Sequence, residues 1–379
     1  MGKQPSFADM FELYLHNLDV LKDWTFIVAT TEPDNMDLYA GMENIEGIKE
    51  RMFTPFANGR VSIINYKIFK RCWQKNDSRV RMQKCVSFDT QTVSYIERYY
   101  KNGNALYEGF NEVIRLLKSS NFGVDHIPYT MENLMLYPER KASVEETLFA
   151  YEMMCGQNVS KTLLCRMRAK AVISLYGKRN FEFPFRAKEI YKMVYLSLLK
   201  MSQIQMGNAQ LPIDQKMKLF LEFMTTRICR VMQPEINLAK LYFTDGGARG
   251  FFGKIHVRNK DLLGPLKNMT WDLMHLRFMD YSSTMFNTRK SDVLIPYFFT
   301  YDRRLQHIRS CYSLQTLAIN TKNHAVIPIY AFGEGVLELV KEQCTYTKHQ
   351  ERMGKTVDVD QLIAECEQEL LKLVYKQKL

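Results

Sequence analysis

Two aspartates stand where an apolar strand pattern passes into a helical pattern. Asp89 follows the apolar run at 85–88, and Asp302 follows a longer run at 293–301. Ligands of α/β sheets bind in the crevice outside the carboxyl ends of parallel strands. If both runs are parallel strands of one sheet, the two carboxylates belong to one binding crevice.

Two further acids lie in helical patterns among apolar neighbours. Asp272 falls within the apolar stretch 271–276, and Glu152 continues the stripe of Val144 and Leu148. A buried carboxylate is costly unless a cation or hydrogen bonds compensate for its charge. Mg²⁺ or Mn²⁺ would explain such a set, because hard cations bind carboxylate oxygens that would otherwise repel each other. One or two such ions would activate water and stabilise the leaving oxygen of a phosphodiester.

Each acid also has a simpler interpretation. Asp89 and Asp302 could be helix N-caps, a common role for aspartate. Asp272 could be an acid of an early helical turn, which the helix dipole favours. Glu152 could pair with a basic side chain. All four acids together favour the metal site over these separate roles.

The hydrophobic periodicity predicts an α/β protein. Strand patterns lie at 24–29, 61–64, 85–88, 293–300 and 325–330. Pro328 indicates an edge position for the last of these, and Pro296 disfavours a central position for the strand at 293–300.

Helical patterns dominate the middle of the chain and its C-terminus. One helix is expected over 215–232 with Asp214 as its N-cap, and an amphipathic helix closes the chain. The predicted segments are an N-terminal basic α/β module at 1–80, a central α/β domain at 81–340 that is helical at about 155–240, and a C-terminal helical extension at 341–379.

The formal net charge of +11 favours a polyanionic partner, nucleic acid before anionic membrane. Lys and Arg are dense at 49–84 and again at 161–192, where they form either a solvated surface or a phosphate-contacting one. The candidate nucleic-acid contacts are Lys67, Lys70, Arg71, Arg166, Arg168, Lys170 and Arg303.

The eight cysteines include no C-x-x-C pair, so the cysteine spacing typical of a zinc site is absent. A reducing, cytoplasmic location is expected. No apolar stretch reaches the ~18–20 residues that span a bilayer, so no membrane partner is expected.

Four short motifs resemble the PIN-domain ribonucleases in their order and context. Asp89 and Asp302 each end a strand motif in this resemblance, and the helical acid is assigned to Glu152, with Glu132 and Glu145 as alternatives. The matching elements are Val86-Ser87-Phe88-Asp89-Thr90, the helical acid Glu152, Trp271-Asp272-Leu273-Met274-His275-Leu276 and Phe298-Phe299-Thr300-Tyr301-Asp302-Arg303-Arg304-Leu305.

The resemblance implies metal-dependent hydrolysis of RNA and a PIN-like α/β/α sandwich with a mostly parallel sheet. It makes 81–340 a PIN-like nuclease domain and about 155–240 a helical insertion within it. It assigns Asp89, Glu152, Asp272 and Asp302 as catalytic residues and as ligands of Mg²⁺ or Mn²⁺, supported by Thr90 and Thr300. Many PIN proteins are toxins or antiviral defence effectors held by a partner, which implies a regulatory protein or a larger assembly.

Two other interpretations remain open. An RNase H-like two-metal nuclease also places its first aspartate on a strand. A non-catalytic nucleic-acid-binding or scaffold protein would use the same acids only to cap helices. Only the nuclease interpretations require the carboxylates to converge on one point.

Overall fold

The computed structural model is an α/β protein that divides into two compact units. Unit 1 comprises 1–179, 276–301 and 313–329, and unit 2 comprises 180–275, 302–312 and 330–379. The units are discontinuous in the chain, and their limits differ from the predicted boundaries at 80 and 340. The structure describes residues 7–33, 35–40, 42, 48–75, 79–103, 110–119, 122–155, 162–178, 187–244, 250–284, 290–323, 325–333, 335–343 and 354–376.

A five-stranded sheet in unit 1 has the order β2-β4-β1-β8-β9. β1 pairs antiparallel with both β4 and β8, so the sheet of the N-terminal segment is completed by strands from far along the chain. β9 lies at the edge, as its proline predicted. The strands are β1 (Trp24–Ala29), β2 (Met36–Asp37), β4 (Arg60–Asn65), β8 (Leu314–Asn320) and β9 (Val326–Tyr330).

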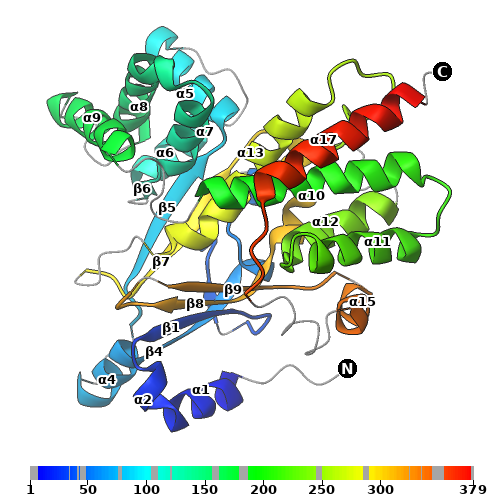
Figure 1. The fold of residues 1–379 in the computed structure, drawn as a ribbon. Coiled ribbons are helices and arrows are strands. Elements are labelled where there is room, and N and C mark those ends of the chain that lie inside the picture. The colour runs from blue at the N-terminus through cyan, green and yellow to red at the C-terminus, as the bar shows by residue number, and fades with distance from the viewer. Residues whose placement is uncertain are drawn as a thin grey trace. The chain divides into compact units, whose positions relative to one another are not determined.

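Short helices lie against this sheet (Figure 1). They are α1 (Phe7–His16), α2 (Leu18–Leu21) and α4 (Tyr66–Lys75). Tyr14 of α1 is buried, and its hydroxyl donates to the carbonyl oxygen of Trp24 at 3.3 Å. Phe11 packs against Phe69 of α4, with ring centroids 5.8 Å apart, whereas Trp73 of the same helix is exposed.

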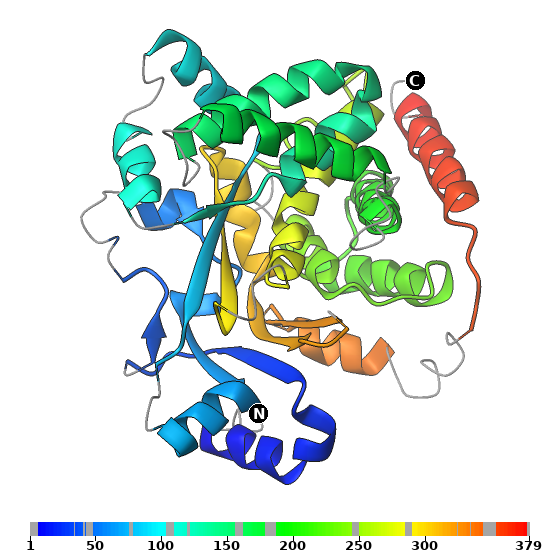
Figure 2. The ribbon, with the colours of Figure 1, turned by 90° about the vertical axis from the view of Figure 1, so that its left-hand side faces the viewer.

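A four-stranded sheet in unit 1 has the order β3-β7-β5-β6. β5 (Met82–Phe88) runs parallel to both β7 (Val293–Phe299) and β6 (Gly123–Val124), whereas β3 (Met52–Phe53) is antiparallel to β7. Figure 2 shows the long β5 beside β7.

The central position of β7 differs from the expectation that Pro296 raised. β3 pairs only with Phe298 and Phe299 of β7, so on that side Pro296 has no described strand partner. The other side of Pro296 is aligned with Cys85 of β5. A proline lacks an N–H donor and is tolerated where one side of its strand is unpaired.

Helices gather at the carboxyl end of β5 (Figure 1). Phe88, the last residue of the strand, packs edge-on against Tyr151 at 5.1 Å between ring centroids. These helices are α5 (Thr90–Asn102), α6 (Phe110–Ser119), α7 (Ile127–Leu136), α8 (Lys141–Cys155) and α9 (Thr162–Lys178).

A buried ion-pair cluster fixes the beginning of β7. The side chain of Asp292 is 1% exposed and accepts from the guanidinium groups of Arg71 at 3.0 Å and Arg81 at 3.1 Å. Burial alone would raise the pKa of Asp292, but the hydrogen bonds from the two arginines outweigh it and hold the pKa below its ordinary value. Arg71 thus serves a structural ion pair.

Unit 2 is helical in its described residues. α10 packs along α17, and the hydroxyl of Tyr195 donates to Glu367 at 2.6 Å between them. The predicted helix over 215–232 is shifted: α11 begins at Ile213 after Pro212 and ends at Thr226, which places Asp214 in its first turn. The helices are α10 (Ala187–Gly207), α11 (Ile213–Thr226), α12 (Gln233–Thr244), α14 (Arg303–Ile308), α15 (Val336–Gln343) and α17 (Val359–Lys376).

The division between the units falls within α13 (Leu263–Ser282). The amphipathic helix predicted near the C-terminus is confirmed as α17, on which Leu362, Cys366, Leu370 and Val374 are buried. Among the described helices, none is both long and apolar enough to cross a bilayer.

Candidate functional site

Asp89 lies between the end of β5 and the start of α5. Its Oδ1 accepts from the N–H of Thr92 at 2.5 Å, which makes Asp89 the N-cap of α5. Its Oδ2 accepts from the hydroxyl of Thr300, which follows β7. The parallel register aligns Phe88 with Phe299, so Asp89 and Thr300 meet at the carboxyl ends of adjacent strands. Both residues are buried.

Glu132 of α7 lies next to this pair of strand ends. The hydroxyl of Thr90, the residue after Asp89, donates to Oε2 of Glu132. The peptide N–H of Asp125, just before α7, donates to the carbonyl oxygen of Val86 on β5 at 2.9 Å and so ties the start of α7 to this strand. The structure therefore places Glu132, the alternative helical acid, beside Thr90, the residue after Asp89.

Glu152, the acid assigned from the motif, has other neighbours. It is 5% exposed, and its two oxygens face Nε2 of His126 at 2.7 Å and the guanidinium of Arg168 at 3.4 Å. Burial raises the pKa of Glu152, but the hydrogen bond and charge of His126 and the charge of Arg168 bring it below its ordinary value. Glu152 therefore pairs with basic side chains, as its simpler interpretation expected.

Asp302 and Asp272 belong to unit 2. Asp302 is the N-cap of α14 and accepts from the N–H of Arg304 at 2.8 Å, and the guanidinium of Arg304 binds both of its oxygens. Burial raises the pKa of Asp302, but these bonds outweigh it and lower the pKa. The hydrogen bond to Asp302 does most to raise the pKa of Arg304, and the charge of Asp272 adds to it.

In unit 1, Asp89 contacts Thr300, and Thr90 contacts Glu132. Glu152 has a separate set of partners in the same unit, His126 and Arg168. In unit 2, Asp272 and Asp302 both interact with Arg304. Within the part of the chain that the structure describes, no three or more His, Cys, Asp or Glu side chains are grouped so that they could hold a metal ion.

No family model, curated protein or solved structure matches this chain. The resemblance to PIN ribonucleases therefore depends on the short motifs of the sequence itself.

Asp125 is a further buried acid that the sequence did not indicate. It follows β6 directly and is 8% exposed. Its Oδ2 accepts from the hydroxyl of Ser282 at 2.6 Å, and its Oδ1 accepts from the N–H of Ile127 at 2.9 Å. Three adjacent parallel strands of unit 1, namely β7, β5 and β6, are thus each followed directly by a polar residue. The two-residue length of β6 explains why no strand pattern was visible there.

The predicted phosphate contacts differ in how far their charges are already paired. Arg166 pairs with Glu146 and lies 4.0 Å from the centroid of the Phe149 ring. Arg168 pairs with Glu152, and Arg71 with Asp292. The remaining candidates are exposed, namely Lys67, Lys70, Lys170 and, in unit 2, Arg303. Part of the basic stretch 161–192 lies outside the described residues, namely Lys161 and 179–186.

Proposed function

We propose that this protein is a divalent-metal-dependent nuclease that hydrolyses phosphodiester bonds, with RNA as its preferred substrate. The observation that carries the proposal is the contact of Asp89 with Thr300 at the carboxyl ends of adjacent parallel strands. This is the edge of a parallel sheet at which ligands bind. Glu132 adds a second carboxylate beside the same strand end.

Two protein carboxylates suit the cation that the proposal requires. Mg²⁺ keeps several waters and is commonly held by one or two carboxylates together with substrate phosphates. Asp89 and Glu132 would hold Mg²⁺ or Mn²⁺ in unit 1. When bound, such an ion would supply an activated water and stabilise negative charge on the phosphate.

The surrounding side chains orient these carboxylates. The hydroxyl of Thr300 and the N–H of Thr92 fix both oxygens of Asp89, and the hydroxyl of Thr90 does the same for one oxygen of Glu132. Fixed ligands need little reorganisation during the reaction. The sequence motifs add Asp272 and Asp302 as predicted ligands, and Asp302 would have to release Arg304 to bind a cation.

Metal-dependent cleavage is the first test. Labelled RNA is expected to be cut in the presence of Mg²⁺ or Mn²⁺, to survive when EDTA is added, and to be cut again after excess metal is restored. Labelled DNA of the same sequence is expected to be cut more slowly. Intact RNA under every metal condition, or cutting that EDTA does not affect, would rule the proposal out.

A non-catalytic nucleic-acid-binding protein is the second candidate, and a specific observation favours it. Both Asp89 and Asp302 cap helices, which is sufficient reason for an aspartate at a helix start. In that case RNA would bind and remain intact.

The exposed lysines of α4 allow a test that separates RNA binding from cleavage. Lysines that contact phosphates release counterions, so the affinity for single-stranded RNA falls with salt. The double variant Lys67→Gln/Lys70→Gln is expected to flatten the slope of log affinity against log salt by about 1.4, at ~0.7 per phosphate contact. Filter binding at several salt concentrations measures this slope.

Arg166→Gln is the matched control, because Glu146 already neutralises Arg166. It is expected to leave the slope nearly unchanged. An unaltered slope in the lysine double variant would show that α4 does not contact RNA.

A further inference from the structure

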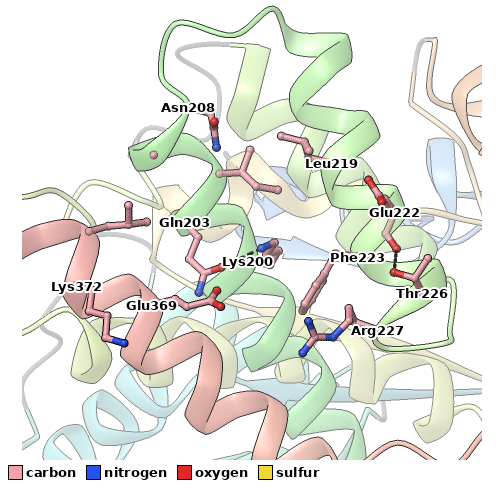
Figure 3. Close-up of a pocket in the computed structure, with 13 residues that line it drawn as sticks. Lys200, Gln203, Asn208, Leu219, Glu222, Phe223, Thr226, Arg227, Glu369 and Lys372 are labelled. Carbon is pink, nitrogen blue, oxygen red and sulfur yellow. Dashed lines mark hydrogen bonds between the residues drawn. The ribbon is translucent and has the colours of Figure 1, made fainter. Parts of the chain in front are cut away.

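Unit 2 contains a groove of about 730 Å³ between α10, α11 and α17. Figure 3 shows side chains from these three helices pointing into one shared space. The volume lies within the range of about 300–1,000 Å³ that small-molecule sites occupy. Its lining residues lie within the part of the chain that the structure describes, and none belongs to the proposed nuclease site.

The floor of the groove is apolar. Ile204 of α10 and Phe223 of α11 are 2% and 6% exposed, and Leu219 and Leu373 extend the apolar lining from α11 and α17. Leu219 is 37% exposed, so apolar surface is in contact with water here. Covering that surface would favour a ligand with an apolar body.

The charge closest to this floor is the ammonium group of Lys200. It lies 5.1 Å from the centroid of the Phe223 ring and donates to Oε1 of Gln203 at 3.2 Å. Gln203 is itself held, because its Nε2 donates to the carbonyl oxygen of Cys366 at 2.6 Å. Within the described residues, Lys200 forms no ion pair with a carboxylate. Lys200 is thus a half-buried positive charge held by Gln203 and Phe223. The carboxylate of Glu369 lines the same groove without an ion pair to Lys200 among the described residues.

The other charges of the groove lie at its exposed rim. Arg227 pairs with Glu365 at 2.7 Å. Lys372, Glu222 and Glu369 are exposed, one positive and two negative. Exposed charges are screened by water and salt, so the half-buried Lys200 has more influence than they do on whether the groove favours an anion or a cation.

We propose that this groove binds a small organic anion with an apolar body. The anionic group would contact the ammonium of Lys200, and the body would cover Phe223, Leu219 and Leu373. Fatty acids and nucleotides share this chemistry. The proposal does not depend on nuclease activity.

Anilinonaphthalene sulfonate, a fluorescent aromatic anion, is the probe for this site. The full chain is expected to bind one equivalent, measured by fluorescence titration. Lys200→Gln is expected to weaken binding about tenfold, the effect of a lost interaction of about 1.4 kcal/mol. Lys372→Gln, the matched rim control, is expected to change the dissociation constant less than about twofold, because exposed charges interact weakly.

Blocking the groove provides an independent variant. A Cβ added at Gly207 would lie 3.5 Å from both terminal methyl carbons of Leu373, and both residues line the groove. Gly207→Met is therefore expected to fill part of the groove and prevent probe binding. The thermal midpoint of each variant verifies that it is folded.

Competition distinguishes the sources of the ligand. Displacement of the probe by decanoate identifies an aliphatic carboxylate, and displacement by AMP identifies a nucleotide. Either result supports the proposal. Probe binding that is unchanged in both Lys200→Gln and folded Gly207→Met would overturn it, as would the absence of displacement by either competitor.

Discussion

Asp89→Asn is expected to lower metal-dependent RNA cleavage by roughly a thousandfold, a loss of about 4 kcal/mol of transition-state stabilisation. Asparagine caps helices about as well as aspartate, so the bond from Thr92 and the start of α5 are expected to remain. The negative charge that would hold the cation is lost. Cleavage rates at saturating metal, together with the thermal midpoint, measure the two effects separately.

Asp358→Asn is the matched control. Asp358 accepts from the N–H of Gln361 at 3.0 Å at the start of α17, so the same substitution is made at another helix start. Cleavage by this variant is expected to equal that of the wild type. If Asp89→Asn also cleaves at the wild-type rate, Asp89 is a helix cap only and does not hold the cation. The same assay with Asp272→Asn and Asp302→Asn tests the two predicted ligands in unit 2.

Glu132→Gln is expected to reduce cleavage, whereas Glu152→Gln is expected to reduce stability. Glutamine at 132 still accepts a hydrogen bond from Thr90 but loses the charge, so cleavage is expected to fall about a hundredfold, or about 2.7 kcal/mol, with little change in thermal midpoint. Glutamine at 152 removes the carboxylate that the buried His126 and Arg168 share. That variant is expected to lose about 1–3 kcal/mol of stability and to retain the cleavage rate of the folded protein.

The stability effect of Glu152 depends on pH in a defined direction. The pKa of Glu152 is lowered in the folded protein, so its stabilising contribution is present above the unfolded value of about 4.3. It is lost as the pH falls through the folded pKa. The difference in unfolding free energy between wild type and Glu152→Gln should therefore shrink at acidic pH. Loss of cleavage without loss of stability in Glu152→Gln, together with normal cleavage by Glu132→Gln, would reinstate Glu152 as the helical acid.

Local features of the fold could be predicted because they depend on neighbouring residues. Strand alternation located β1 at 24–29, and the end of β5 before Asp89 was visible as an apolar run closed by an acid. Pro328 indicated the edge position of β9, since a residue without an N–H donor is disfavoured in a paired strand. The end of α11 was placed too late: Arg227 and Cys229 follow the helix, and Cys229 has a left-handed φ of 57°.

The partner of each strand and of each acid was decided only by the tertiary structure. β1 pairs with β8, which begins at Leu314, so the predicted segment 1–80 does not complete its own sheet. Hydrophobic periodicity indicates that an acidic side chain on a helix points inward. It does not indicate which side chains that acid contacts. Glu152 meets His126 and Arg168, whereas Glu132 meets Thr90, because the packing of α7, α8 and α9 brings together residues that are far apart in the chain.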